Sequence, residues 1–249
     1  MKLVLMADNY VGQAVYDYLA MNFPEDIAMV VTVTDNILYN KARDAGFHAS
    51  IFVSEDTLFD DLCRHKLSGM IDIGILAWWP KILHEPIITF PRQGFINFHP
   101  SLLPYNRGKH YNFWALVEQS PFGVTLHFID GGIDKGDIIA QHEIFYDWTD
   151  TGASLYHKAQ QEILNLFYET YPKIRIGEVC RIRQDHSKGS FHLAKEIEFA
   201  SQLEIDKTYL ARDLLNLIRA RTFPGHPACY FFEKGHKYEV RIEIKKIEL

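Results

Sequence analysis

Apolar runs alternate with segments of helical periodicity along the first part of the chain. Short aliphatic runs, rich in β-branched residues, occupy residues 2–7, 27–33, 71–77 and 94–98. Between them lie stretches whose apolar side chains recur every three or four positions, the spacing of an amphipathic helix, at residues 11–19, 40–45 and 57–66. Strands that alternate with helices in this way predict an α/β fold with an open, mostly parallel sheet flanked by helices.

The rest of the chain predicts a hairpin-like strand pair, one long helix and a separate C-terminal part. Residues 125–129 and 138–144 read as two strands around a loop of glycines and aspartates, and residues 154–174 form the longest helical pattern. The polar stretch 184–190 marks a boundary, so we predict domains at 1–183 and 184–249. The second contains a helix and two short strands, at 208–219, 228–232 and 237–243.

Composition excludes several classes of protein. The chain has 249 residues, a formal net charge of −6 and three cysteines without CxxC spacing. An acidic chain is a poor candidate for broad nucleic-acid binding, and three such cysteines form neither a disulfide framework nor a zinc site. No apolar run approaches the ~20 residues that cross a bilayer, and the first residues lack the features of a signal peptide. We therefore expect a cytoplasmic protein that binds no metal, nucleic acid or membrane.

Three polar sites fall at predicted carboxyl ends of strands, where open parallel sheets bind ligands. These are Asp8, residues 77–80 and residues 97–100, and we expect them to line one cleft. Only Gly12 follows the first strand, so the glycine fingerprint of a dinucleotide site is missing and a dehydrogenase is disfavoured.

Asn97 and His99 lie two positions apart at a strand end, so their side chains leave on the same face. An amide donor beside an imidazole suits acyl transfer, because the amide can stabilise an oxyanion while the imidazole exchanges a proton. The alternative is that both side chains merely satisfy loop backbone groups.

The loop at residues 130–137 carries three glycines and three aspartates. Simple turn chemistry explains such a composition, and so does a carboxylate placed next to a histidine, which would raise the imidazole pKa. Calcium binding is a third interpretation, and the acidic spacing does not match an EF-hand.

Residues 94–141 resemble the folate-dependent formyltransferases, the family that includes methionyl-tRNA formyltransferase and glycinamide ribonucleotide transformylase. The family's Asn-x-His-Pro-Ser-Leu-Leu-Pro motif matches Asn97 through Pro104, and its catalytic aspartate matches Asp134. Residues 105–110, 114–115, 219–224, 230 and 237–238 are similar to the nucleotide-linked amino-sugar N-formyltransferases. That subgroup carries Pro-Asn near Trp114, where this chain has Tyr111-Asn112-Phe113, a departure that bears on substrate specificity.

The resemblance implies a Rossmann-like catalytic domain, N10-formyltetrahydrofolate as the formyl donor, and Asn97, His99 and Asp134 as catalytic residues. It implies a folate site formed by Ala77, Trp78, Trp79, Pro80, Lys81, Ile82, Asp130, Gly131 and Gly132. It implies a nucleotide-sugar site, helped by the C-terminal subdomain, formed by Tyr105, Asn106, Arg107, Lys109, His110, Trp114, Arg219, Phe223 and Tyr230.

The acceptor implied by the resemblance is a dTDP-linked amino-dideoxy sugar, with dTDP-4-amino-4,6-dideoxyglucose as the first choice and a 3-amino-3,6-dideoxy isomer as the next. Such a reaction serves the biosynthesis of surface polysaccharide such as O-antigen. Methionyl-tRNA formylation is the main rival; it would call for a larger, basic C-terminal domain. The resemblance also implies a homodimer.

Overall fold

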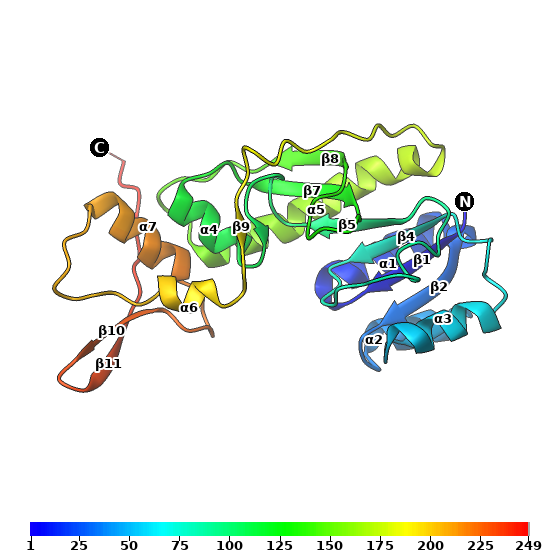
Figure 1. The fold of residues 1–249 in the computed structure, drawn as a ribbon, viewed down its shortest axis with the longest axis horizontal. Helices are drawn as coiled ribbons and strands as arrows, with labels where there is room; N and C mark the ends of the chain where they lie inside the picture. The colour runs from blue at the N-terminus through cyan, green and yellow to red at the C-terminus, as the bar shows by residue number, and fades with distance from the viewer. Residues whose placement is uncertain (249) are drawn as a thin grey trace. The chain divides into compact units, whose positions relative to one another are not determined.

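A seven-stranded sheet organises the fold, and the computed structural model describes residues 1–248. The strand order is β3-β2-β1-β4-β5-β7-β8 (Figure 1). β1 pairs in parallel with β2 and β4, and β4 pairs in parallel with β5, so the predicted open, mostly parallel sheet is confirmed. The strands are β1 (Leu3–Ala7), β2 (Ile27–Thr32), β3 (Ala49–Ile51), β4 (Ile73–Ala77), β5 (Phe95–His99), β7 (Gly123–Phe128) and β8 (Ile138–Glu143).

The chain forms two compact units that interleave along the sequence. The first comprises Met1–His99, Leu126–Ala140 and Leu164–Arg183. The second comprises Pro100–Thr125, Gln141–Ile163 and the described residues from Gln184 onward. The division predicted at residue 183 stays a prediction, since the units follow spatial contacts and not one cut in the chain.

The first unit is built around strands that are buried along their whole length. All five residues of β1 and of β4 are buried, as continuous aliphatic runs covered on both faces require. α1 (Asn9–Asn22) turns Val11, Val15 and Leu19 into the core. α2 (Ile37–Asp44) lies against β2 and β3 (Figure 1). α3 (Glu55–Arg64) starts at a capping box formed by the side chains of Ser54 and Thr57.

The C-terminal part of α5 (Gly152–Arg175) belongs to this unit and packs through aromatic rings. Phe167 contacts Phe98 and Tyr18, with ring centroids 5.0 and 5.9 Å apart. Further along the helix, the hydroxyl of Tyr171 donates to the buried carboxylate of Asp26 at 2.8 Å. These contacts cover one face of the unit with side chains that lie far apart in sequence.

The second unit combines short elements. α4 (Tyr111–Glu118) packs against α7 (Ala211–Arg221), and the two-residue strands β6 (Arg107–Gly108) and β9 (Phe191–His192) pair in parallel. β10 (Cys229–Glu233) and β11 (His236–Val240) form an antiparallel hairpin whose turn is at Lys234 and Gly235, as predicted. The remaining elements are the short helix α6 (Glu196–Ala200) and, in the first unit, a 3-10 turn at Pro24–Asp26.

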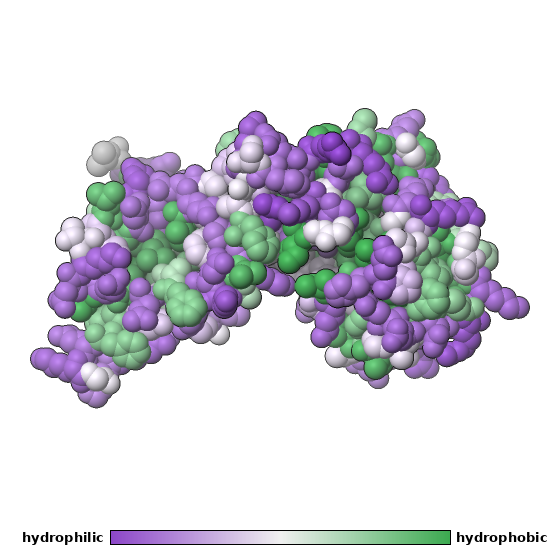
Figure 2. Space-filling model, in the orientation of Figure 1, coloured by the Kyte–Doolittle hydropathy of each residue, from purple (hydrophilic) through white to green (hydrophobic). Residues whose placement is uncertain are grey.

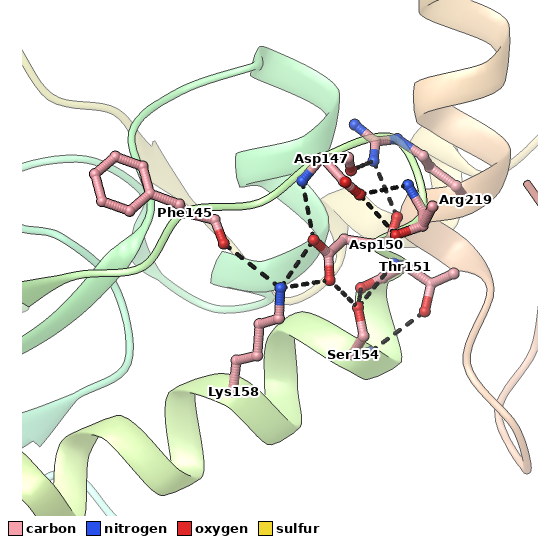
Figure 3. Close-up of polar contacts among 8 residues, drawn as sticks. Phe145, Asp147, Asp150, Thr151, Ser154, Lys158 and Arg219 are labelled. Carbon is pink, nitrogen blue, oxygen red and sulfur yellow. Dashed lines mark hydrogen bonds and ion pairs between the residues drawn. The ribbon is translucent and has the colours of Figure 1, made fainter. Parts of the chain in front are cut away.

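A carboxylate-centred network closes the loop before α5 (Figure 3). Asp150 accepts from the Ser154 hydroxyl at 2.7 Å, from the backbone N–H of Asp147 at 3.0 Å and from the Lys158 ammonium at 2.9 Å. Arg219 of α7 donates to the carbonyls of Asp147 and Asp150. The network thus fixes the start of α5 to α7.

The sequence pattern missed β3, β6, β9, α4 and α6. β3 has three residues, all only partly buried, which is too few to display an alternating pattern. α4 follows His110, whose φ is 60° and whose side chain forms no cap, so the usual start signal of a helix is lacking.

Hydrophilic residues cover most of the face seen in Figure 2, interrupted by separate hydrophobic patches. Within residues 1–248, none of the helices combines the length and the hydropathy needed to span a membrane.

Candidate active site

Asn97 and His99 leave the end of β5 on one face, as their spacing predicts. His99 is buried, and Asn97 is partly buried. Phe98, between them, points the other way and packs on Phe167. The strand therefore fixes the backbone of both polar residues through the packing of its opposite face.

His127 of β7 joins this pair, although the sequence did not single it out. Its Nδ1 lies 2.8 Å from the carbonyl oxygen of Phe128, which can only accept, so Nδ1 carries the proton. Nε2 then has a lone pair and accepts from the Asn97 amide nitrogen at 3.2 Å. Burial lowers the pKa of His127 to about 4, which keeps this ring neutral near pH 7.

Asp134 completes the cluster from the loop between β7 and β8. Its Oδ1 lies 3.5 Å from Nδ1 of His99 and 3.7 Å from Nε2 of His127. Because His127 is neutral and Nε2 bears no proton, the carboxylate acts on His99. The side chain of Asp134 is only 12% exposed, so its charge is poorly screened where it faces His99.

The Asp134 loop is held in an unusual conformation. Asp134 has a φ of 52°, a left-handed backbone that side chains other than glycine seldom adopt. The carboxylate of Asp130 accepts a hydrogen bond from the backbone N–H of Gly132 at 2.9 Å. At the base of the loop, the backbone N–H of Phe128 donates to the carbonyl of Asp137 at 2.9 Å. A Cβ on Gly136 would lie 1.8 Å from the Phe128 carbonyl oxygen, so only glycine fits. The surrounding contacts therefore impose the backbone that presents the carboxylate.

The residues predicted to bind folate lie at the end of β4 and in the Asp134 loop. Trp78 has a φ of 57°, and Trp79 packs edge-on against Phe52 with centroids 5.4 Å apart. The indole N–H of Trp79 is buried and has no acceptor within the described part of the chain. Ala77 is buried; Pro80, Lys81, Ile82, Asp130 and Gly131 are exposed, and Gly132 is partly buried.

The residues predicted to bind the nucleotide sugar all lie in the second unit and have different surroundings. Asn106 is fully buried and donates to Glu118 at 3.0 Å, so it is committed to the fold. Arg107 is only 8% exposed, and its Nε and Nη1 groups have no partner among the described residues. Trp114 is stacked on His192. Burying guanidinium groups that lack acceptors costs free energy, so the surroundings of Arg107 differ from those of Asn106.

The remaining predicted sugar-binding residues are divided between two surroundings. Arg219 is buried and bonded to the Asp147 and Asp150 carbonyls described above. Phe223 packs against Tyr156 at 5.6 Å, and the buried Tyr230 lies under the Lys237 ammonium at 3.8 Å. Tyr105 and His110 are partly buried, and Lys109 is exposed.

Burial lowers the pKa of His110, and the nearby charges of Arg221 and Lys109 lower it further. Arg221 has a buried Nε with no partner in the part of the chain that the structure describes. Cationic groups therefore gather around the start of α4.

Across residues 1–248, no three His, Cys, Asp or Glu side chains converge in the manner of a metal site.

Comparison with known families assigns the class of the protein. Residues 2–170 match the model of the formyl transferase family, and the chain belongs to that family. Residues 196–246 match the model of an N-formyltransferase dimerization C-terminal domain. The resemblance seen in the motif at Asn97 is therefore confirmed.

Solved structures extend the likeness over both units. A sugar N-formyltransferase from a Shewanella species has a TM-score of 0.81 at 20% identity, covering 100% of this chain and 99% of that chain. The formyltransferase PseJ from Anoxybacillus kamchatkensis, solved with UDP-4,6-dideoxy-4-formamido-L-AltNAc and tetrahydrofolate, has a TM-score of 0.61 at 29% identity. It matches over 87% of this chain and 97% of its own.

One curated relative is a methionyl-tRNA formyltransferase. Methionyl-tRNA formyltransferase of Thermodesulfovibrio yellowstonii is 34% identical over 197 residues, which is 76% of this chain. The match spans 59% of the length of that relative.

Proposed function

We propose that this protein transfers a formyl group from N10-formyltetrahydrofolate to the amine of a nucleotide-linked amino sugar. The observation that carries the proposal is the cluster of Asn97, His99 and Asp134, with His127 behind it. An amide donor, a buried imidazole and a carboxylate in contact are the groups that formyl transfer between nitrogens requires.

Each residue has a defined task in the proposed reaction. Asn97 uses one amide N–H on His127, and its second N–H has no partner in residues 1–248, so it can donate to the oxyanion that develops on the formyl oxygen. His99 accepts the proton that the attacking amine loses. The imidazolium returns this proton to N10 of the folate as the bond between N10 and the formyl carbon breaks. Asp134 stabilises the imidazolium that results, since its carboxylate lies 3.5 Å from Nδ1. The donor supplies an activated formyl group, so no enzyme nucleophile is needed.

The folate site is proposed at residues 77–82 and 130–132, which border the catalytic cluster in sequence. Its support is the buried indole N–H of Trp79, which lacks an acceptor in the described residues. A pterin ring carries the heteroatoms that such a donor needs. The exposed Gly131 and the partly buried Gly132 leave the backbone of this loop open to a flat ligand.

The acceptor is proposed to carry phosphate. Arg107 presents a buried guanidinium without a counter-charge, and Arg221 and Lys109 add cations near the start of α4. Arginine binds phosphate through paired N–H groups, so a nucleoside diphosphate would supply the missing acceptors. The relative from Anoxybacillus, which matches this chain across most of its length, was solved with a nucleotide sugar formylated at the 4-amine.

At the finer level, we propose dTDP-4-amino-4,6-dideoxyglucose as the acceptor, in the biosynthesis of a surface polysaccharide such as O-antigen. The 3-amino-3,6-dideoxy isomer is the alternative. The dimerization-domain match at residues 196–246 supports a homodimer, and we place the enzyme in the cytoplasm.

Methionyl-tRNA formylation is the second candidate because of the 34% identity to the Thermodesulfovibrio enzyme. The charge of this chain argues against it, because tRNA binding depends on phosphate neutralisation and the net charge is −6. The C-terminal match to an N-formyltransferase dimerization domain also favours the sugar acceptor.

Mass spectrometry tests the proposal. The protein is incubated with N10-formyltetrahydrofolate and, in parallel, with dTDP- and UDP-linked 3-amino and 4-amino sugars and with methionyl-tRNA. We expect a formyl mass gain on a nucleotide sugar and a loss of turnover by about 10²-fold or more in Asn97→Ala, His99→Ala and Asp134→Ala. Formylation of methionyl-tRNA alone, or near-normal turnover in His99→Ala, would contradict it.

A further inference from the structure

His192 sits in a segment that is tied along its backbone to the loop after the catalytic motif. Arg107 donates its N–H to the carbonyl of Ser190, and Lys109 donates to that of His192, both at 3.0 Å. A Cβ on Gly189 would lie 2.0 Å from the Pro104 carbonyl oxygen, so glycine allows this close approach. Residues 189–192 therefore form a wall against residues 104–109.

The imidazole of His192 is bound on three sides. Its Nε2 lies 2.6 Å from a carboxylate oxygen of Glu118, and its Nδ1 lies 3.0 Å from one of Glu196. The ring is stacked on the indole of Trp114, with centroids 3.8 Å apart and an angle of 8° between the planes. Carboxylate oxygens only accept, and a neutral imidazole has a single N–H. Both bonds form together only when His192 is the imidazolium.

The surroundings of the two carboxylates and of the ring suit this arrangement. Glu118 also accepts hydrogen bonds from the Asn106 amide at 3.0 Å and from the Ser190 hydroxyl at 2.8 Å, so its carboxylate is held in place by two further donors. The hydrogen bond from His192 lowers the pKa of Glu196. The imidazole is only 12% exposed, and stacking on an indole face favours a cation there.

The charged groups around the His192 ring are of both signs. Glu118 faces it from α4 and Glu196 from α6. Arg107 and Lys109 of the paired segment, Lys195 beside Glu196, and Arg221 near the start of α4 are cations of the neighbouring elements. The two carboxylates bond the ring directly, and the side chains of these cations do not.

We propose that His192 is a positioning residue whose protonated form clamps the 189–192 segment, Trp114 and the Arg107 loop into the acceptor-binding conformation. The inference rests on the proposed function for its effect on the acceptor, but the clamp itself can be tested without any substrate. Loss of one proton breaks a bond to Glu118 or Glu196 and removes the cation from the indole face, which loosens the wall beside Arg107.

Tryptophan fluorescence of the whole chain tests the clamp. A protonated imidazole stacked on an indole quenches the emission of that indole, so the emission should rise when the ring loses its proton as the pH is raised. The rise should disappear in His192→Gln and in Trp114→Phe, and should persist in His186→Gln, which alters an exposed histidine of the same segment. Glu196→Gln should shift the rise to lower pH, because one stabilising carboxylate charge is gone. An unchanged rise in His192→Gln, or no shift in Glu196→Gln, would overturn the proposal.

Steady-state kinetics then tests the effect on the acceptor. In His192→Gln we expect the KM for the amino-sugar nucleotide to rise by about tenfold with kcat changed less than about twofold, as expected for loss of a charged hydrogen bond outside the reacting atoms. The KM of the unmodified enzyme should rise over the same pH range as the fluorescence, and the variant should show a flat KM there. A fluorescence response without any change in KM would overturn the positioning role, whereas absence of turnover in every form would count against the proposed function alone.

Discussion

The amide nitrogen of Asn97 lies 3.2 Å from Nε2 of His127, and this bond fixes which way the Asn97 amide faces. His127 in turn is oriented by its own Nδ1–H, which donates to the Phe128 carbonyl. The amide N–H that would bind an oxyanion is therefore positioned by a neutral histidine that lies 30 residues further along the chain.

Substitution of His127 should lower kcat more than it raises KM. His127→Leu removes the acceptor and lets the amide rotate, so we expect kcat to fall by about tenfold or more. His127→Gln offers a carbonyl oxygen in its place and should restore part of the rate. Initial rates at saturating donor would give both constants. Equal rates in the leucine variant and the unmodified enzyme would show that Asn97 needs no such support.

The low pKa of His127 predicts a stability that depends on pH. The ring has a folded pKa of about 4 against an unfolded value of about 6.5, so the unfolded chain binds more protons between these values. The contribution of the neutral ring is fully present above about pH 6.5 and is lost as pH falls toward 4, amounting to about 2–3 kcal/mol between pH 7.5 and 4.5. Urea unfolding at both pH values measures it, and His127→Leu should lose correspondingly less stability. Parallel losses in both proteins would rule out this histidine as the cause.

Two glycines of the Asp134 loop offer a matched pair. A Cβ on Gly136 would lie 1.8 Å from a backbone oxygen, whereas a Cβ on Gly131 would meet nothing within 4 Å. Gly136→Ala should therefore displace Asp134 and reduce turnover by about tenfold or more, whereas Gly131→Ala should leave the loop backbone and the thermal unfolding of the protein unchanged. Circular dichroism and thermal unfolding would separate a local shift from general unfolding. A fully active Gly136→Ala variant would contradict the fixed geometry of the loop.

Substitution of Arg219 distinguishes a role in substrate binding from a role in the stability of the fold. The resemblance predicts a role in nucleotide-sugar binding, whereas the guanidinium is bonded to Asn216 at 2.9 Å and to two loop carbonyls (Figure 3). We expect Arg219→Ala to lower the free energy of unfolding by about 2–4 kcal/mol, since buried acceptors lose their donor. Arg212→Ala, which removes an exposed arginine over the Trp148 ring, should cost much less. A raised KM with unchanged stability would instead support the binding role.

Local pattern alone predicts the longer helices and strands and the shared face of Asn97 and His99, but not β3, β6, β9, α4 and α6. Alternation in strand β5 places Asn97 and His99 on one face. A short, continuous aliphatic run such as β4 predicts a buried strand of a parallel sheet. Asp134 required the resemblance, because its position depends on a left-handed backbone that no periodicity encodes.

The roles of other residues could not be predicted from the sequence, because they depend on burial and on contacts that only the fold shows. His127 lies inside a strand where every residue is buried, so alternation gives no sign of a polar site. Arg107 and Arg219 look alike in sequence, yet Nε and Nη1 of Arg107 are buried without a partner among residues 1–248, whereas Arg219 is bonded to a loop. Only contacts between distant segments distinguish them.

The order of strands in the sheet has a consequence for synthesis of the chain. β1 to β5 lie within the first ninety-nine residues, so these strands can pair before the later segments leave the ribosome. The faces of Phe98 and Tyr18 that Phe167 covers, and the Asp26 carboxylate that Tyr171 caps, stay open until α5 is made. A nascent chain that stops before α5 therefore exposes an aromatic surface and a carboxylate without its tyrosine, and it should need a chaperone for as long as that helix is missing.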